Sequence, residues 1–226
     1  MKLAIDTSLS SGSIALGTEE RIIYSAFFDI KITHSETLMP AIDIALKFCD
    51  ITQKDLSAIY ICSGPGSFTG IRIGIATAKG IAMGLGLPLF AYSSLELAAL
   101  EYSGLGKNIL VCIDAKMKEI YCGFYDPCLR EIISPQVLKP DDICQLSIDK
   151  YILCGSAAPL LTPLLKAAGR IFYPVHPATL IPNAGGLFAL GDLLPHKHVQ
   201  QDMAALEPLY LRESTAQVQK NKSLKK

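Results

Sequence analysis

The sequence predicts an α/β fold of two similar lobes, because strand-like and helix-like segments alternate and the pattern begins again half-way along the chain. The segment LVCIDAK (110–116) repeats the pattern of KLAIDTS (2–8), each a strand that ends in Ile-Asp. The segment KYILCGSAAP (150–159) repeats that of AIYICSGPG (58–66), each an apolar strand that ends at glycine and leads into a helix. Two such matches in one order indicate an internal repeat, and a cleft between the lobes is the expected place for a ligand.

The first half of the chain carries the more complete copy, in which period-2 and apolar runs predict strands and three- to four-residue steps predict helices. The expected elements are strands at 2–6, 13–17 and 21–28, a helix at 34–49, a strand at 58–63, a helix that opens at 65–70 and runs to about 84, a strand at 88–92 and a helix at 93–102. Ser67 or Thr69 is expected to cap the second helix, and Ser93 or Ser94 the third.

The second half repeats this order in compressed form. It contains the strands at 110–116 and 150–155, a hairpin partner at 119–126, a glycine-weakened helix at 183–194 and a closing extended segment at 207–212. We expect lobes at 1–104 and 105–212, each built of βββαβα units. The last segment, 213–226, holds four lysines and little that could be buried, so a disordered basic tail is expected there.

Composition excludes several classes of protein. Lys plus Arg and Asp plus Glu both number 21, so no long-range field draws the whole chain to RNA or to an anionic membrane. The seven cysteines lack C-x-x-C spacing, which favours buried reduced thiols over a disulfide or zinc framework. No signal peptide precedes the first strand, and Arg72 and Lys79 interrupt the best candidate for a membrane span. We therefore expect a cytoplasmic, soluble protein without membrane contact.

A glycine-rich run, SGPGSFTGIRIGIATAKGIAMGLG (63–86), could serve three kinds of chemistry. A P-loop requires a Gly-Lys pair at a set step, and none follows Gly64 or Gly66. A dinucleotide fingerprint requires a third glycine at position 69, where threonine stands. An esterase elbow requires glycines two residues before and two residues after Ser67, where Pro65 and Thr69 stand. What remains is a tight turn that feeds a helix apolar nearly all round.

A helix that is apolar nearly all round must be buried nearly all round, and one sheet covers only one side of it. Glycines inside a helix cost about 1 kcal/mol each relative to alanine, which close packing against another backbone would offset. Internal packing against the 34–49 helix explains part of this surface, and a two-sided interface with another protein is the sharper hypothesis. The expected interface residues are Leu38, Ile42 and Ala45 on the first helix and Arg72, Ile73, Ala76, Lys79, Gly80, Met83 and Gly84 on the second.

Several strings together are similar to one family. GPGSFTGIRIGIATAKGIAMGL with LPL and AYSSLE, together with LAIDTS, HSETLMPAID, CIDAK, KEIYCGFY and PLYLR, resembles the TsaB (YeaZ) family over residues 3 to about 212. The resemblance implies an actin-like, two-lobed fold of the sugar-kinase and Hsp70 superfamily. It also implies a role in tRNA modification, as the partner subunit in the formation of N6-threonylcarbamoyladenosine at position 37.

In that family the partner is TsaD, the catalytic subunit that moves the threonylcarbamoyl group onto tRNA, and the ATPase TsaE joins the assembly. The resemblance therefore implies a non-catalytic subunit that pairs with a TsaD-like enzyme, forms a homodimer when alone, and contacts tRNA mainly through its partner. The two helices described above are the family's dimerisation surface.

Departures from the catalytic relatives favour this non-catalytic role. Those relatives carry H-x-x-x-H on the first helix, but here His34 is followed at that step by Leu38, so no catalytic residue, metal or cofactor is expected. A vestigial nucleotide or anion site is considered at Asp6, Ser67, Thr69, Asp114 and Lys116. The aspartates lack the nearby glycine that close approach to a phosphate needs, so simple closure of strands is the alternative.

Two competing functions stay open at this point. The two lobes and the repeated Asp-ending strands are also compatible with an ATP-using enzyme of the sugar-kinase type. A glycoprotease-like peptidase is the weakest alternative, because the sequence lacks H-E-x-x-H.

Overall fold

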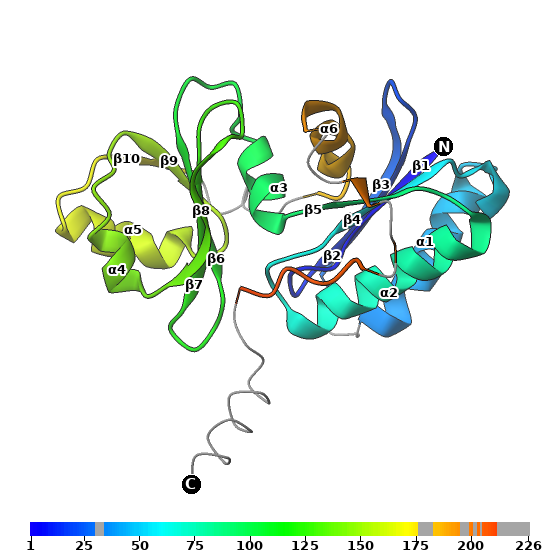
Figure 1. Cartoon of the computed structure of the whole chain (residues 1–226), viewed down its shortest axis with the longest axis horizontal. Helices are drawn as coiled ribbons and strands as arrows, with labels where there is room; N and C mark the ends of the chain where they lie inside the picture. Colours follow the sequence, from blue (N-terminus) through cyan, green and yellow to red (C-terminus); the bar gives the residue numbers. More distant parts are fainter. Residues whose placement is uncertain (30–33, 176–182, 195–198, 201–202, 204, 212–226) are drawn as a thin grey trace, which may run out of the picture.

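The computed structural model describes residues 1–29, 34–175, 183–194, 199–200, 203 and 205–211, which form two sheets with helices on their faces (Figure 1). The first sheet has the strand order β11-β5-β4-β1-β2-β3, and the second has the order β10-β9-β6-β7-β8. The strands of the first are β1 (Lys2–Asp6), β2 (Gly12–Gly17), β3 (Ile22–Phe28), β4 (Ala58–Cys62), β5 (Leu89–Tyr92) and β11 (Val199–Gln200). Those of the second are β6 (Ile109–Asp114), β7 (Ile120–Tyr125), β8 (Glu131–Leu138), β9 (Tyr151–Cys154) and β10 (Phe172–Pro174).

The two sheets share one topology, which confirms the internal repeat. In each sheet the first strand pairs antiparallel with the second and parallel with the fourth, as β1 does with β2 and β4 and β6 does with β7 and β9. Both halves run through three strands, a helix, a strand and a helix in that order. The matched segments of the sequence, β1 with β6 and β4 with β9, therefore occupy equivalent places in the two sheets.

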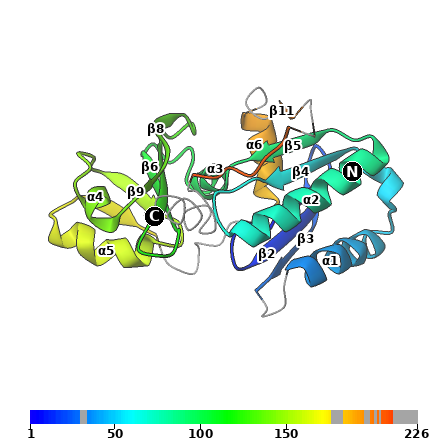
Figure 2. The same cartoon turned by 60° about the horizontal axis from the view of Figure 1, so that its bottom comes forward.

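The helices lie in layers on and between the sheets (Figures 1 and 2). Those of the first half are α1 (His34–Phe48), α2 (Phe68–Leu85) and α3 (Ser94–Leu100), with a short 3-10 turn at Gln53–Asp55. Those of the second half are α4 (Pro140–Cys144), α5 (Ala158–Ala167) and α6 (Gly186–Leu193). The pair α1 and α2 lies side by side on the outer face of the first sheet, α4 and α5 lie on the outer face of the second, and α3 lies between the lobes.

The space between the lobes is filled by an apolar core rather than left as the expected cleft. Helix α3 packs against β6 and β7 of the second sheet, and α6 packs against α3 and β4. One continuous cluster joins Tyr60 and Leu187 on the side of the first sheet with Val111 and Tyr125 of the second, all buried. The expectation of an open ligand cleft is therefore wrong where α3 lies, because its apolar side chains are buried against both sheets.

The end of the chain corrects the expected division into lobes at 104 and 105. Helix α6 contacts β4 and β5, and β11 pairs antiparallel with β5, so both segments pack on the first sheet rather than the second. The closing segment at 207–212, expected to be extended, is described to residue 211 and pairs in no described ladder, although the Leu209 N–H donates to the Ser63 carbonyl at 2.9 Å. The expected basic tail at 213–226 lies outside the described residues.

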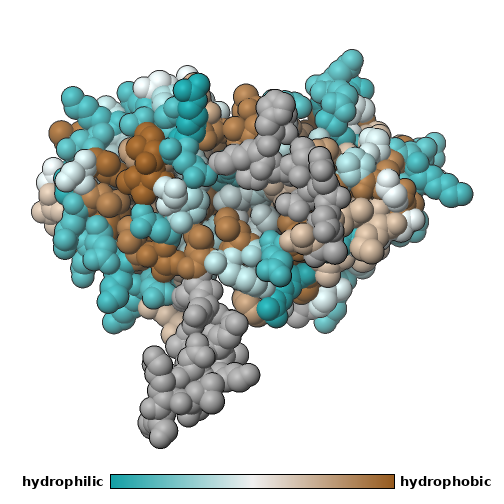
Figure 3. Space-filling view, viewed as in Figure 1, coloured by the Kyte–Doolittle hydropathy of each residue, from teal (hydrophilic) through white to brown (hydrophobic). Residues whose placement is uncertain are grey.

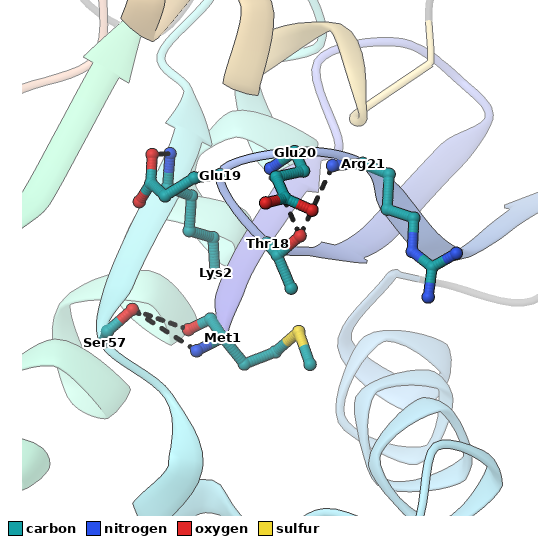
Figure 4. A network of polar contacts seen from close by, with 7 residues as sticks. All are labelled: Met1, Lys2, Thr18, Glu19, Glu20, Arg21 and Ser57. Carbon is teal, nitrogen blue, oxygen red and sulfur yellow. Dashed lines mark hydrogen bonds and ion pairs between the residues drawn. The ribbon is translucent and has the colours of Figure 1, made fainter.

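The amino end of the chain is tied to the first lobe by polar contacts (Figure 4). The Met1 ammonium donates to the Asp55 carbonyl at 3.0 Å, and the Ser57 N–H donates to the Met1 carbonyl at 2.7 Å. The Lys2 ammonium, on a buried side chain, lies 2.6 Å from a Glu19 carboxylate oxygen. Burial alone would lower the pKa of Lys2, but the hydrogen bond and charge of Glu19 outweigh it and raise that pKa. Strand β1 is therefore held at its start as well as along its length.

All seven cysteines lie in the described part of the chain and are free, and four of them are buried. The burial of these four agrees with the expectation of buried thiols, whereas Cys128 is exposed. Among the described residues, no helix is both long and apolar enough to cross a bilayer.

Helix α2 is held on the sheet by glycines at its start. A methyl group at Gly66 would overlap the carbonyl oxygen of Ser8, and one at Gly70 would overlap that of Thr7. The Ser67 N–H donates to the Ser8 carbonyl at 2.6 Å, and the Thr7 hydroxyl donates to the Gly70 carbonyl at 2.7 Å. The turn after β1 and the first turn of α2 are thus in direct backbone contact, which only a residue without a Cβ atom allows.

Two alanine substitutions in α2 should therefore act in opposite directions. We expect Gly70→Ala to lower the free energy of unfolding by about 2 kcal/mol, because the overlap involves a backbone atom. Gly80→Ala, where the new methyl meets nothing within 4 Å, should raise it by up to about 1 kcal/mol. Urea unfolding, at concentrations where light scattering gives the monomer mass, measures both. Equal effects of the two variants would contradict the close contact at Gly70.

Candidate partner interface

Helix α2 has well-defined ends and two different faces. Its N-cap is Ser67, whose hydroxyl accepts the Gly70 N–H at 3.2 Å, which confirms one of the two expected caps. Its C-cap is Gly86, in the left-handed region at φ 67°. One face is buried against the sheet and consists of Gly70, Ile71, Gly74, Ile75, Ala78 and Ala82. The opposite face of this 18-residue helix carries its exposed positions, among them Ala76, Gly80, Met83 and Gly84.

All seven residues of α2 that were expected at an interface lie outside the buried face. Arg72, Ala76, Gly80, Met83 and Gly84 are exposed, and Ile73 and Lys79 are partly buried. A methyl group built at Gly80 or Gly84 would meet nothing within 4 Å. Figure 3 shows weakly hydrophobic, light-brown residues at the right of the view, on the side of the molecule where α2 lies. The small side chains on this outer face of α2 therefore leave its backbone accessible to the backbone of another helix.

The expected interface residues on α1 are wrong. Leu38, Ile42 and Ala45 are at most 1% exposed and belong to the core under the first sheet. Two apolar stripes run along this helix, and the sheet takes the one that was assigned to a partner. The second stripe reaches the surface instead, since Ile44 is 58% and Phe48 78% exposed. A partner surface on α1 must therefore use this second stripe. Within it, the centre of the Phe48 ring lies 5.6 Å from that of the Tyr24 ring of β3.

Sequence analysis missed a cluster at the start of α2. The Arg72 guanidinium carbon lies 3.8 Å from the centre of the Phe68 ring, and Arg72 Nε donates to the Tyr210 hydroxyl at 2.6 Å. The Phe68 and Tyr210 rings are stacked with centres 5.2 Å apart. Both rings remain over a third exposed, so the cluster lies at the surface beside the outer face of α2. The sequence contains one signal for this cluster, the PLYLR string that includes Tyr210. Nothing in the sequence indicates that Tyr210 contacts Arg72, which lies 138 positions earlier.

The residues considered for a nucleotide or anion site form two separate groups. Asp6 is buried, and one of its carboxylate oxygens accepts the Ser8 N–H at 2.9 Å. Asp114 instead pairs with Lys116, which donates to it from Nζ at 2.7 Å and from its backbone at 2.8 Å. Ser67 is used by its own helix as a cap, and Thr69 is exposed. Both aspartates thus have structural partners of their own, in agreement with the simpler alternative of strand closure.

The environments of the two aspartates shift their pKa values in opposite directions. Burial raises the pKa of Asp6, and the hydrogen bonds from Ser8 and the neighbouring Cys62 oppose that shift only in part. Burial acts in the same direction on Asp114, but the hydrogen bonds and charge of Lys116 outweigh it and lower the pKa of that carboxyl. The two carboxyl groups, which occupy matching positions in the repeat, therefore differ in their electrostatic environment.

A shallow hollow of about 450 Å³ lies beside the C-terminal segment, lined by Ser63, Ala91, Ser93, Leu206, Glu207, Pro208, Leu209 and Tyr210. None of the residues considered for an anion site lines it. Within the described ranges, no group of three or more His, Cys, Asp or Glu side chains is placed to hold a metal ion.

Comparisons with known proteins show the family to which this chain belongs. The family model described as TsaD, tRNA N6-adenosine threonylcarbamoyltransferase, matches residues 30–220. The tRNA threonylcarbamoyladenosine biosynthesis protein TsaB of Escherichia coli (strain K12) is 30% identical over 231 residues, which cover 95% of each chain. The chain belongs to the TsaB family. The TsaB protein of Bacillus subtilis (strain 168) is 41% identical over 123 residues, and that match spans only 54% of this chain and of the relative.

Solved structures confirm the expected fold of this TsaB-family chain. YeaZ from Pseudomonas aeruginosa superposes with a TM-score of 0.77 at 27% identity, over 93% of this chain and 99% of that one. A Bacteroides thetaiotaomicron protein with an actin-like ATPase fold superposes with a TM-score of 0.50 at 11% identity, over 85% of this chain and 95% of that one. The fold is therefore the actin-like fold that the resemblance implied.

The buried aspartate gives a prediction about pH. A folded-state pKa raised above the unfolded value makes the wild type lose stability as the pH rises through that interval, which begins at about pH 4. Asp6→Asn keeps the acceptor for the Ser8 N–H without the charge. We therefore expect the variant to become more stable relative to the wild type as the pH rises from 4 to 7. Urea unfolding measures this difference as an increase in the free energy of unfolding of the variant relative to that of the wild type.

Asp114→Asn is the matched control, and it should show no such trend over most of this range. Because Lys116 lowers the pKa of Asp114, the stability that this group gives the wild type is fully present above the unfolded pKa of about 4 and is lost only as the pH falls below it. Parallel pH trends for the two variants would contradict the assigned environments.

Proposed function

We propose that this chain is a non-catalytic subunit that binds and activates a TsaD-like threonylcarbamoyltransferase through the outer face of α2. The observation that carries the proposal is the exposed, small-residue face of an 18-residue helix, in which a Cβ atom built at Gly80 or Gly84 would meet nothing within 4 Å beyond the neighbouring helix backbone. Each of these glycines costs the isolated helix about 1 kcal/mol relative to alanine. Packing against the backbone of a partner helix would offset that cost.

Kinship between the two subunits supports this choice of partner. The chain matches the model of the TsaD family itself, so the enzyme and this subunit share an ancestral fold. A TsaD-like partner would therefore present a helix equivalent to α2, and two equivalent helices can pack about a pseudo-twofold axis. The same geometry accounts for a homodimer of this chain when the partner is missing.

The contacts of the two aspartates support a non-catalytic role over an ATP-using enzyme. The Asp6 carboxylate is buried and bonded to its own strand end, and Asp114 is paired with Lys116. The further expectations follow from the same assignment: a TsaE-like ATPase joins the assembly, tRNA is held mainly by the partner, and the complex works in the cytoplasm. An ATP-binding enzyme remains the alternative, and ATP turnover by the isolated chain would favour it.

The direct test is reconstitution of the modification reaction. Threonylcarbamoyladenosine formed in tRNA is measured with the TsaD-like enzyme, a TsaE-like ATPase, ATP and the activated threonylcarbamoyl donor, with and without this chain. We expect product only when the chain is present. Equal product in its absence would contradict the proposed function.

Leucine at Gly80 and Gly84 should break the complex without unfolding the chain. The Gly80→Leu/Gly84→Leu double variant places two large side chains where the partner backbone would approach, and we expect its affinity for the TsaD-like subunit to fall at least about a hundredfold. Since a Cβ atom at either position meets nothing and leucine has a higher helix propensity than glycine, the free energy of unfolding should not fall below that of the wild type and should rise by about 1 kcal/mol or more.

The matched control is Lys166→Leu, which adds a leucine to an exposed position on α5. Light scattering of mixtures measures the complex, and urea unfolding measures stability. Loss of binding in the control, or full binding by the double variant, would contradict the assignment of the interface to α2.

A further inference from the structure

The Arg72 side chain is immobilised on the surface of the chain. Its guanidinium carbon lies over the Phe68 ring at 3.8 Å from the ring centre, and its Nε donates to the Tyr210 hydroxyl at 2.6 Å. The Tyr210 ring itself is 5.7 Å from the guanidinium carbon and stacks beside Phe68. A free arginine loses much side-chain entropy when it binds a ligand, and this one has already lost it in the unbound chain.

The contacts of Arg72 leave the end of its guanidinium available. A guanidinium has five N–H donors, and the Nε donor is the one used by Tyr210. The remaining four, on the two terminal nitrogens, form the fork that binds a carboxylate or a phosphate with two parallel hydrogen bonds. In the part of the chain that the structure describes, no carboxylate forms an ion pair with Arg72. The fork is thus positioned for an acceptor that the chain itself does not supply.

The charges in the sequence segment that contains Arg72 indicate which class of molecule supplies the acceptor. From residue 56 to residue 95 the chain contains no Asp or Glu, and Arg72 and Lys79 are its only charged residues. Binding to RNA draws on many cations, whereas two cations on an otherwise apolar face suit a protein interface. Arginine and aromatic residues are also the side chains that most often dominate such interfaces.

We infer that Arg72, held by Phe68 and Tyr210, is the docking cation for an Asp or Glu side chain of the TsaD-like partner. This inference rests on the proposed function, because it assigns the same face of α2 to that partner. Phe68 and Tyr210 are positioning residues: the ring of one lies against the guanidinium and the hydroxyl of the other binds its Nε, which leaves the two terminal nitrogens for the acceptor.

The experiment is a calorimetric titration of the full chain with the TsaD-like subunit. Arg72→Gln should weaken the complex about thirtyfold, and its remaining affinity should depend less on salt than that of the wild type. Arg72→Lys, which keeps the charge but loses the fork, should weaken it about tenfold. Tyr210→Phe, which removes only the hydrogen bond to Nε, should weaken it about threefold. Arg130→Gln, at an exposed arginine of the second lobe, is the matched control and should bind as wild type does.

Charge reversal separates a direct ion pair from a general disturbance of the surface. Arg72→Glu should lose binding, and one Asp→Arg or Glu→Arg substitution on the packing helices of the partner should restore it. Thermal unfolding of each variant shows whether it is folded at the temperature of the titration.

Two results would overturn the inference. One is binding of Arg72→Gln within twofold of wild type while the double leucine variant at Gly80 and Gly84 does not bind, in which case the interface stands and the docking cation does not. The other is an unchanged heterodimer with a weakened affinity of the assembled complex for tRNA, which would assign the fork to a phosphate. Full binding by the double leucine variant would instead refute the proposed interface itself.

Discussion

The backbone contact between the first turn of α2 and the turn after β1 is the constraint on which the rest of the first lobe depends. Gly66 and Gly70 lie against the carbonyl oxygens of Ser8 and Thr7, so this end of the helix cannot rotate or rise from the sheet. With one face committed to the sheet, the opposite face is turned outward along the whole helix. The glycine-rich run therefore serves two purposes, close packing within the chain at its start and an open surface at its end.

The second lobe repeats the close backbone contact of the first lobe, but the outer face of its equivalent helix is different. Gly155, at the end of β9, approaches the backbone of Cys112 in β6 in the same manner, and a Cβ atom there would overlap a carbonyl oxygen. The helix that follows, α5, carries exposed Leu160 and Leu164 where α2 carries small residues. Two equivalent helices thus present different surfaces, with small residues on the outer face of α2 and exposed leucines on α5. The repeat supplied the scaffold, and small residues distinguish the copy whose outer face we assign to the partner.

Local sequence signals predicted the fold well, and they predicted the candidate site only in part. The caps at Ser67 and Ser93 and the matched strands follow from rules that act over a few residues, and the structure confirms them. Periodicity could not decide which of two apolar stripes on α1 faces the sheet, so Leu38 was assigned to the wrong side. The contact between Arg72 and Tyr210 and the return of α6 to the first sheet depend on the complete tertiary arrangement, which no local pattern encodes.

The most direct test of the account is photo-crosslinking from a single position on the outer face of α2. A photoreactive phenylalanine analogue at Ala76 is compared with one at Leu160 on α5, the equivalent helix of the second lobe, each in the presence of the TsaD-like subunit. The account predicts a crosslink to the partner from position 76 and none from position 160. A crosslink from position 160 alone would contradict it, because the partner would then bind the face of the repeat that lacks the glycines.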